Sequence, residues 1–273
     1  MAKKSKKPSL VEQSTRREFL RKQQEAQHKI QARNRRIVIS VAIVLGVVVA
    51  SVFIGVFVNQ AQRAGGGTVV PPSANGDQTG IIVNSPMAAS AQHKVVVYFD
   101  YQCPPCADLE KTYGPQLQTA ANTGTIALEF HAMTGLETQL RNDSSTRAAV
   151  GAACADTVGY YAAYHDQILL NQPERQGTGY TGEQLRNTFP AAVGISGADL
   201  TAFQQCYDTR ATQQFVQKVA DAGVQAGITG TPTVLVDGQV VDPATLPTLL
   251  ATFAQEAAPS TPATPSTSAT AAS

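Results

Sequence analysis

Two cysteines, Cys103 and Cys106, stand two residues apart in the run FDYQCPPC at positions 99–106. In the first turn of a helix this spacing brings the two sulfur atoms within bonding distance. The unpaired backbone N–H groups and the positive end of the helix stabilise a thiolate on the first cysteine. Pro104 suits the first helical position, because the N–H that proline lacks has no helical partner there. The motif therefore predicts thiol–disulfide exchange.

Two other uses of a C-x-x-C pair remain open. One is half of a zinc site, but zinc takes about four ligands. The sequence contains neither a second C-x-x-C nor a closely spaced histidine pair, so we expect no metal. The other is an inert structural disulfide, which the exposed start of a helix disfavours.

The elements that position the motif alternate between strand and helix. Residues 94–99 (KVVVYF) have the composition of a buried strand, and the helix that follows runs from residue 103 to about 121. A stretch from about 135 to 226 carries helical signals only. The remaining predicted elements are strands at 125–131, 233–236 and 239–241 and a helix at 249–254.

The last two strands are joined by Asp237-Gly238, which is typical of a type I′ hairpin turn. The order of elements predicts an α/β domain over residues 81–258, with a small mixed sheet and a large helical insertion.

Two motifs together resemble a known family. The run FDYQCPPC and the run GITGTPTVLVDG at 227–238 resemble the thioredoxin fold in its DsbA-like branch, over roughly residues 81–256. The resemblance implies a thioredoxin-like fold with a helical insertion. It also implies that Thr231-Pro232 is a cis-proline loop that packs against the C-x-x-C and holds substrate peptide. From the residues alone, an ordinary trans turn before a strand is the alternative.

The chain is similar to membrane-anchored DsbA-like proteins of actinobacteria, in which a second cysteine pair sits in the helical domain. This resemblance implies a structural disulfide between Cys154 and Cys206, which fall on two different predicted helices. Two buried free thiols are the alternative.

The residues around the motif bear on how strongly the thiolate is stabilised. Pro105 removes a backbone N–H, and it brings no imidazole, unlike the Pro-His dipeptide of the strongest oxidants in this family. Val97 stands where thioredoxins and many DsbA-like proteins have a buried carboxylate, so a charge that would oppose the thiolate is missing. We expect a Cys103 pKa below the free value of about 8.5 and above the DsbA extreme of about 3.5.

Two further side chains are candidates for the site. Asp100, three positions before Cys103, is either a proton relay for Cys106 or a strand-end residue that pairs with solvent or a turn amide. His131 ends a predicted strand near the site, and a core or solvated histidine is favoured over a catalytic one.

The N-terminal part of the chain has the pattern of a membrane anchor. Residues 1–36 hold 12 of the 21 Lys and Arg residues and 3 of the 20 Asp and Glu residues. The run at 37–58 has no charge, and a helix of this length spans about 33 Å, enough for a hydrocarbon core of about 30 Å. A cleaved signal peptide is the alternative, but its apolar region runs to about 7–15 residues.

Arginines directly before the apolar run predict a cytoplasmic N-terminus and an extracytoplasmic domain, in a single-pass protein of the cytoplasmic membrane. The basic segment 1–36 suits contact with anionic lipid, and we expect no nucleic acid because no aromatic residues interleave its charges. A linker is predicted at 59–80, and a disordered Ser/Thr/Pro tail at 259–273.

These features predict a membrane-anchored thiol–disulfide oxidoreductase, most simply an oxidase that introduces disulfides into reduced exported proteins and needs no bound cofactor. The family implies a quinone-linked membrane partner, vitamin K epoxide reductase-like or DsbB-like, that re-oxidises the cysteine pair. The alternatives are a disulfide reductase, for example in cytochrome maturation, and a non-catalytic anchored module that binds peptides.

Overall fold

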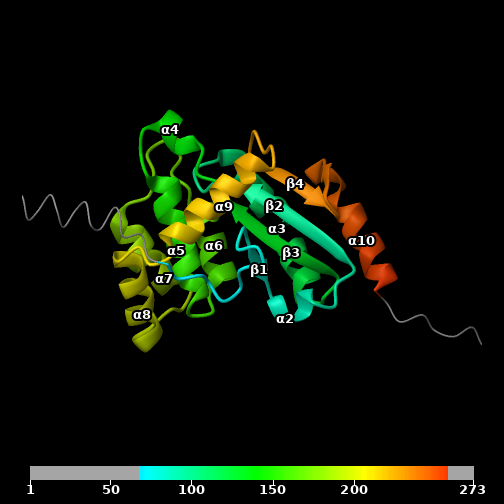
Figure 1. Ribbon diagram of the computed structural model, residues 1–273, viewed down its shortest axis with the longest axis horizontal. Helices are drawn as coiled ribbons and strands as arrows, with labels where there is room; N and C mark the ends of the chain where they lie inside the picture. The colour runs from blue at the N-terminus through cyan, green and yellow to red at the C-terminus, as the bar shows by residue number, and fades with distance from the viewer. Residues whose placement is uncertain (1–67, 258–273) are drawn as a thin grey trace, which may run out of the picture. The chain divides into compact units, whose positions relative to one another are not determined.

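The computed structural model describes residues 68–257 (Figure 1). The predicted basic segment, membrane helix and C-terminal tail lie outside the described residues, as does the first part of the predicted linker. Within residues 68–257 no helix combines the length and the apolar character needed to cross a membrane.

A five-stranded mixed sheet forms the centre of the described region. Its spatial order is β1-β3-β2-β4-β5, with β2 and β3 parallel and all other neighbours antiparallel. The strands are β1 (Ile81–Val83), β2 (His93–Phe99), β3 (Ile126–Ala132), β4 (Thr233–Val236) and β5 (Gln239–Val241).

The two parallel strands are buried on both faces. On one face of the sheet Val97 of β2 pairs with Phe130 of β3, and both are 1% exposed; on the other face Tyr98 of β2 is 8% exposed. Strands of this kind need cover on both sides. Helices α3 (Pro104–Asn122) and α9 (Gln213–Gln225) both pack against β3, and α10 (Leu246–Glu256) packs against α3. In Figure 1, α9 crosses the front of the sheet.

Helices fill the stretch between β3 and β4, as the sequence predicts. They are α4 (Leu136–Leu140), α5 (Ser144–Asp156), α6 (Tyr161–Leu170), a π-helical turn (Gln184–Thr188), α7 (Phe189–Ala192), α8 (Gly197–Asp208) and α9. A short helix α2 (Ser85–Ala88), which the sequence analysis did not predict, follows β1.

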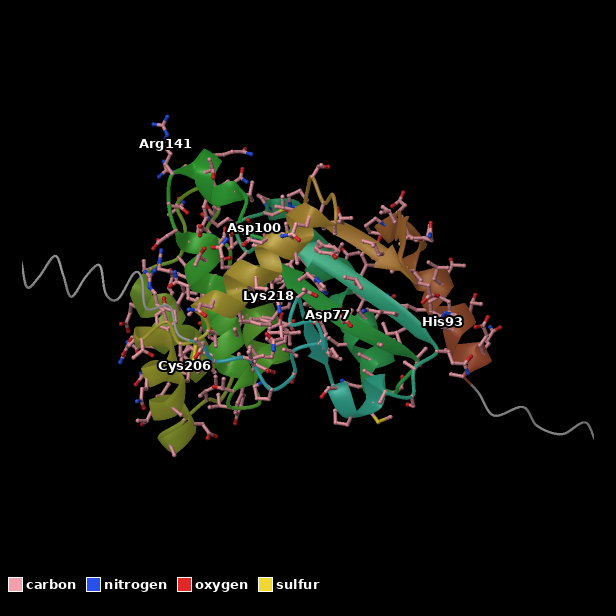
Figure 2. All side chains as sticks on the ribbon, viewed as in Figure 1. Asp77, His93, Asp100, Arg141, Cys206 and Lys218 are labelled. Carbon is pink, nitrogen blue, oxygen red and sulfur yellow. A yellow bond between two sulfur atoms is a disulfide. The ribbon has the colours of Figure 1, made fainter. Side chains whose placement is uncertain are left out.

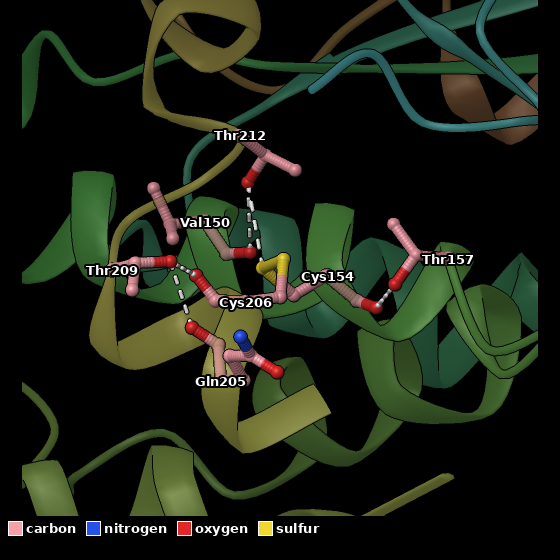
Figure 3. Close-up of a disulfide and its surroundings, with 7 residues drawn as sticks. All are labelled: Val150, Cys154, Thr157, Gln205, Cys206, Thr209 and Thr212. Carbon is pink, nitrogen blue, oxygen red and sulfur yellow. Dashed lines mark hydrogen bonds between the residues drawn. A yellow bond between two sulfur atoms is a disulfide. The ribbon is translucent and has the colours of Figure 1, made fainter. Parts of the chain in front are cut away.

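Helix α5 is buried around most of its surface, because its alanine-rich sequence lets α6, α8 and α9 approach closely. Gly151 is required at one such contact, since a Cβ there would lie 2.8 Å from the Tyr164 hydroxyl. A disulfide between Cys154 and Cys206 joins α5 to α8, with 5.7 Å between the Cα atoms (Figure 3). The pairing implied by the family resemblance is therefore confirmed.

Composition predicts that the domain starts at residue 81, but residues before 81 already pack against it. Within the predicted linker, the Ser73 N–H donates to Asp156 of α5 at 2.8 Å, and the Asn75 side chain donates to Glu129 of β3 at 3.0 Å. Composition does not reveal these contacts, because Ser and Asn are common in linkers and here form hydrogen bonds to the domain.

The C-terminal hairpin has the predicted turn. Asp237 and Gly238 both have positive φ angles, 49° and 82°, as a type I′ turn requires. Helix α10 begins at Leu246, three residues before the predicted start, with Pro247 in its first turn. A proline is tolerated there because the first-turn N–H groups have no helical partner.

Candidate redox site

The two cysteines of the motif lie at the junction of β2 and α3. Cys103 is the N-cap residue of α3, Pro104 occupies the first turn, and the Cys106 N–H donates to the Cys103 carbonyl at 3.0 Å. Both cysteines are free thiols and both are largely buried, with Cys103 4% and Cys106 1% exposed. Strand β2 delivers Cys103 to the start of the helix, as the sequence predicts.

The two thiols differ strongly in acidity. A hydrogen bond from Cys106 lowers the pKa of Cys103 to about 7, and contact with Thr231 adds to the effect. Burial and the neighbouring Cys103 raise the pKa of Cys106 above its usual range. The value for Cys103 lies between the limits expected from the sequence. Cys103 is therefore suited to be the attacking and leaving sulfur, and Cys106 its protonated partner.

The loop before β4 packs against the motif. The Thr231-Pro232 peptide bond is cis, as the family resemblance implies. The Thr231 carbonyl oxygen lies 3.2 Å from the Cys103 sulfur. This loop brings backbone polar groups next to the thiol, where an extended peptide could pair with them.

An open cavity of about 470 Å³ lies beside Cys103. One of the residues that line it is Val224, which is 67% exposed. The lining comes from four segments of the chain and includes Asp100, Cys103, Pro104, Pro105, Met133, Leu136, Gln139, Gln176, Val224, Ile228 and Thr231. Cys106 does not line it. The cavity gives an incoming thiol access to Cys103 from one side.

Asp100 is buried at the carboxyl end of β2, and Figure 2 marks it at the opposite end of that strand from His93. Its carboxylate accepts hydrogen bonds from Ser145, Gln102 and Leu136. Burial raises the pKa of Asp100 to about 6. Its negative charge raises the pKa of Cys103, whereas Cys106 is contacted by the Asp100 backbone. The charge of the carboxylate therefore affects the pKa of Cys103, whereas only the backbone of Asp100 affects the pKa of Cys106.

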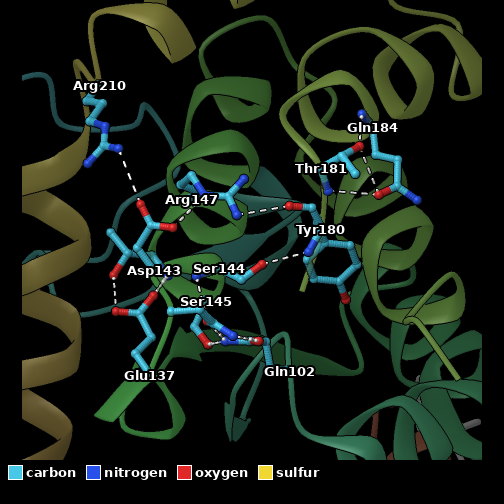
Figure 4. Close-up of polar contacts among 12 residues, drawn as sticks. Gln102, Glu137, Asp143, Ser144, Ser145, Arg147, Tyr180, Thr181, Gln184 and Arg210 are labelled. Carbon is cyan, nitrogen blue, oxygen red and sulfur yellow. Dashed lines mark hydrogen bonds and ion pairs between the residues drawn. The ribbon is translucent and has the colours of Figure 1, made fainter. Parts of the chain in front are cut away.

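The helical insertion supplies contacts that the sequence analysis missed. The Gln172 amide donates to the carbonyls of Tyr101 and Cys103 at 2.9 and 3.0 Å, and the Tyr180 hydroxyl donates to the Tyr101 carbonyl at 2.7 Å. Figure 4 shows Tyr180, Gln102 and the start of α5 gathered in this region. No local signal marks these residues, because their partners lie about seventy positions away in the chain.

The side chains at two other positions are structural. Val97, at the position where related proteins have a buried carboxylate, packs as an apolar side chain in the centre of the sheet. His131 is 5% exposed, and its Nε2 lies 3.1 Å from the Glu129 carboxylate, which also pairs with Lys94 at 2.7 Å. Of the two placements that the sequence favours over a catalytic role, core and solvated, the structure shows the core one.

One group of side chains has the chemical types that bind metals. Glu110 of α3 and His165 and Asp166 of α6 place one ligand atom each within 4.8 Å of one another. Gln118 donates to both Asp166 oxygens at 2.7 Å, and His165 Nε2 lies 3.5 Å from Glu110. In the described structure these contacts tie α3 to α6.

Solved structures with a similar fold are thiol–disulfide oxidoreductases by name. DsbA from Mycobacterium tuberculosis has a TM-score of 0.53 at 19% identity, over 64% of this chain and 92% of that one. MdbA from Actinomyces oris has a TM-score of 0.55 at 20% identity, over 67% and 92%. MdbA from Corynebacterium diphtheriae has a TM-score of 0.55 at 18% identity, over 71% and 99%.

These likenesses show the fold, a thioredoxin-like core with a DsbA-like helical insertion. No curated protein matches the sequence. A family model described as Thioredoxin (Thioredoxin_4) matches residues 88–253, which include the C-x-x-C, the cis-proline loop and the whole insertion. The chain therefore belongs to this thioredoxin family.

Proposed function

We propose that this protein is a thiol–disulfide oxidoreductase that oxidises reduced exported proteins through Cys103 and Cys106. The observation that carries the proposal is the pair of opposed acidities at the start of α3, beside a cavity that reaches Cys103. Membership of the thioredoxin family and the DsbA-like fold support the same chemistry.

The proposed reaction moves two electrons from a substrate dithiol to the protein. A substrate thiolate attacks the Cys103 sulfur, the Cys103–Cys106 bond breaks, and its electron pair stays on Cys106, which takes up a proton. A second substrate thiolate then attacks the substrate sulfur of the mixed disulfide. Cys103 leaves as a thiolate, which its lowered pKa favours.

The substrate peptide is proposed to bind across the cavity mouth, with the cis-proline loop of Thr231 and Pro232 as its backbone partner. The apolar side chains of Met133, Leu136 and Val224 there suit a substrate that is still unfolded and exposes apolar residues. A quinone-linked membrane protein, vitamin K epoxide reductase-like or DsbB-like, would return the cysteine pair to the disulfide.

The proposed location is the outer side of the cytoplasmic membrane, with residues 37–58 as a single-pass anchor. The support is the uncharged run in the sequence and the basic segment before it. Digestion of intact spheroplasts by an external protease should remove the domain at 68–257, whereas a cytoplasmic marker stays protected. A domain that is protected together with the marker contradicts this orientation.

A disulfide reductase is the second candidate, and the acidity of Cys103 is the observation that favours it. A pKa of about 7 equals that of the reductant thioredoxin and lies far above the DsbA extreme of about 3.5. The reduction potential separates the two functions. Equilibration with glutathione should give a value above about −200 mV for an oxidase, whereas a value near −270 mV favours the reductase.

A refolding assay tests the exchange reaction itself. The oxidised protein should form disulfides in a reduced client protein, and Cys103→Ala should not. If the wild type forms no more disulfides in the client than Cys103→Ala does, the protein is no oxidoreductase of this kind and the peptide-binding alternative stands.

A further inference from the structure

The contact between α3 and α6 buries charged groups that the exchange reaction does not use. Glu110 of α3 is 3% exposed, His165 of α6 is fully buried, and the neighbouring Asp166 is half-buried. No lysine or arginine of residues 68–257 lies within ion-pair distance of either carboxylate. Buried charges in proteins are paired with an opposite charge or bound to a metal ion, so this cluster has room for a cation.

The distance between His165 and Glu110 is too long for a hydrogen bond and suits two ligands of one metal ion. His165 Nε2 lies 3.5 Å from Glu110 Oε2, beyond the usual N–H···O length of about 2.7–3.2 Å. This nitrogen is buried and has no hydrogen-bond partner in the described part of the chain. Two ligand atoms that are each about 2.0–2.2 Å from a tetrahedral zinc ion lie about 3.3–3.6 Å apart. The observed distance falls within that range.

The imidazole of His165 is oriented by a contact on its other nitrogen. The Tyr101 hydroxyl lies 3.0 Å from His165 Nδ1, and both side chains are fully buried. In the tautomer whose Nδ1–H donates to Tyr101, the lone pair of Nε2 points toward Glu110. Histidines that bind metals have such a partner on the second nitrogen, because it fixes the tautomer and the orientation of the ring.

Gly114, one helical turn after Glu110, leaves the space that the Glu110 carboxylate occupies. A Cβ at this position would overlap a carboxylate oxygen of Glu110. Glycine in the interior of a helix is less stable than alanine. The glycine therefore weakens α3 locally, and it lets the carboxylate lie beside His165.

The side of the cluster that reaches solvent is at Asp166. Its two oxygens both accept from the Gln118 amide, at 2.7 Å each, and Gln118 is itself only half-buried. Because Glu110 and His165 are enclosed, Asp166 is the ligand that can turn inward to close a site. The same side admits the ion and a water molecule for its fourth position.

We propose that Glu110, His165 and Asp166 bind one Zn²⁺ ion, with water as the fourth ligand. The ion fastens the redox helix α3 to helix α6 of the insertion. Imidazole is a good ligand for zinc, whereas Ca²⁺ and Mg²⁺ prefer sites made of oxygen ligands. The sequence predicts no metal at the cysteines, and this site uses none of them. The inference does not depend on the proposed function, because no step of the exchange passes through these three side chains.

The test is zinc binding by the oxidised full-length protein. Oxidation joins Cys103 to Cys106, so that no free thiolate competes for the ion. After removal of metal with EDTA, competition with a chromophoric chelator should give one zinc ion per chain. At free zinc 100 times the dissociation constant, Tm should rise by about 5–10 °C. The same concentration of Ca²⁺ or Mg²⁺ should leave Tm unchanged.

Three conservative variants test the ligands and the orienting contact. Glu110→Gln and Asp166→Asn each remove a charged ligand with little change of shape, so zinc binding should weaken by more than about 100-fold. Tyr101→Phe keeps all three ligands and removes the partner of Nδ1, so binding should weaken about 10- to 100-fold. Asp166 is half-buried, so its variant covers the case that a change at the buried Glu110 prevents folding.

A second histidine that contacts two carboxylates provides a matched control. His93 Nδ1 lies 2.8 Å from Asp237, and His93 Nε2 lies 2.8 Å from Glu256. Both ring nitrogens are therefore hydrogen-bonded, and neither is free for a metal ion. Asp237→Asn keeps a residue that suits the hairpin turn, and it should leave zinc binding unchanged.

The outcomes separate this inference from the proposed function. The inference is overturned if the oxidised wild type binds no zinc, or if Asp237→Asn weakens binding and Asp166→Asn does not. An equal rise of Tm with Ca²⁺ and with Zn²⁺ contradicts the role of the imidazole. Exchange through Cys103 is measured separately by the refolding assay, and none of these results changes its outcome.

Discussion

Removal of the Cys154–Cys206 disulfide should destabilise the domain substantially and leave the redox chemistry of Cys103 and Cys106 in place. The bond links positions separated by 52 residues. In the chain-entropy treatment, a closed loop of about 50 residues restricts the unfolded chain by about 4 kcal/mol at 25 °C. For a domain of this size such a loss corresponds to about 10 °C in Tm.

Packing adds to this loss in the Cys154→Ala/Cys206→Ala variant. Cys154 is fully buried, and the Thr212 hydroxyl lies 3.6 Å from its sulfur, so two alanines leave unfilled volume between α5 and α8. The entropic and packing contributions differ in their effect on denaturant unfolding. An uncrosslinked chain exposes more surface when it unfolds, so the denaturant m-value should rise, whereas lost packing leaves it unchanged.

The assay is urea unfolding in a background that lacks the redox cysteines, so that no thiol exchange interferes. The parent Cys103→Ala/Cys106→Ala is compared with the same protein carrying the two further alanines. We expect a lower midpoint and a higher m-value in the variant that lacks all four cysteines. The fully reduced parent, which keeps both sulfur atoms, should show the same rise in m-value and a smaller fall in midpoint. A midpoint within measurement error of the parent would refute the reasoning. With the redox pair restored, glutathione should reduce the folded double variant at close to the wild-type rate.

Three other changes have specific expected results. Cys106→Ala should trap mixed disulfides on Cys103 that mass spectrometry detects, whereas Cys103→Ala should trap none; equal trapping contradicts the assignment of the attacking sulfur. Pro105→His, at an exposed position, should lower the pKa of Cys103 below about 7 and raise the reduction potential. The pKa is followed by thiolate absorbance against pH, and an unchanged titration curve contradicts this prediction. His93→Gln should lower Tm at pH 5.5 but not at pH 9. A hydrogen bond to Asp237 is the main cause that raises the pKa of His93 above 6.5, so its contribution is complete below pH 6.5 and is lost as pH rises through the folded value; an equal deficit at both pH values contradicts this.

The motif and the elements beside it could be predicted from the sequence because their signals are local. The apolar run of β2 followed by Cys103-Pro104 fixes a strand-to-helix junction within ten residues. Asp237-Gly238 fixes a hairpin turn because few residues tolerate two consecutive positive φ angles. The family resemblance supplied what spacing could not, namely the cis-proline and the Cys154–Cys206 pairing.

The rest depends on contacts between distant segments. Ser145 lies in the stretch that carries helical signals only, and nothing in the neighbouring sequence indicates that its hydroxyl faces Asp100, 45 positions earlier. Likewise Ser73 and Asn75 have the composition of a linker and become part of the domain only because Asp156 and Glu129 lie opposite them. Such pairings are decided by tertiary packing, which composition and periodicity do not encode residue by residue.

The helical insertion completes the redox loop, because the backbone from residue 101 to 103 takes donors from it. Gln172 donates to the carbonyls of Tyr101 and Cys103, and Gln176 donates to the Gln102 carbonyl at 3.4 Å. A buried carbonyl that loses its donor costs about 1–3 kcal/mol, so the loop is held in place by side chains outside the thioredoxin core. Movement of the segment that carries these two glutamines would release the Cys103 carbonyl and change the helix start that stabilises its thiolate. The position of the Cys103 backbone is therefore set by the core and the insertion together, whereas the side chains that shift the pKa of Cys103, namely Cys106 and Asp100, belong to the core.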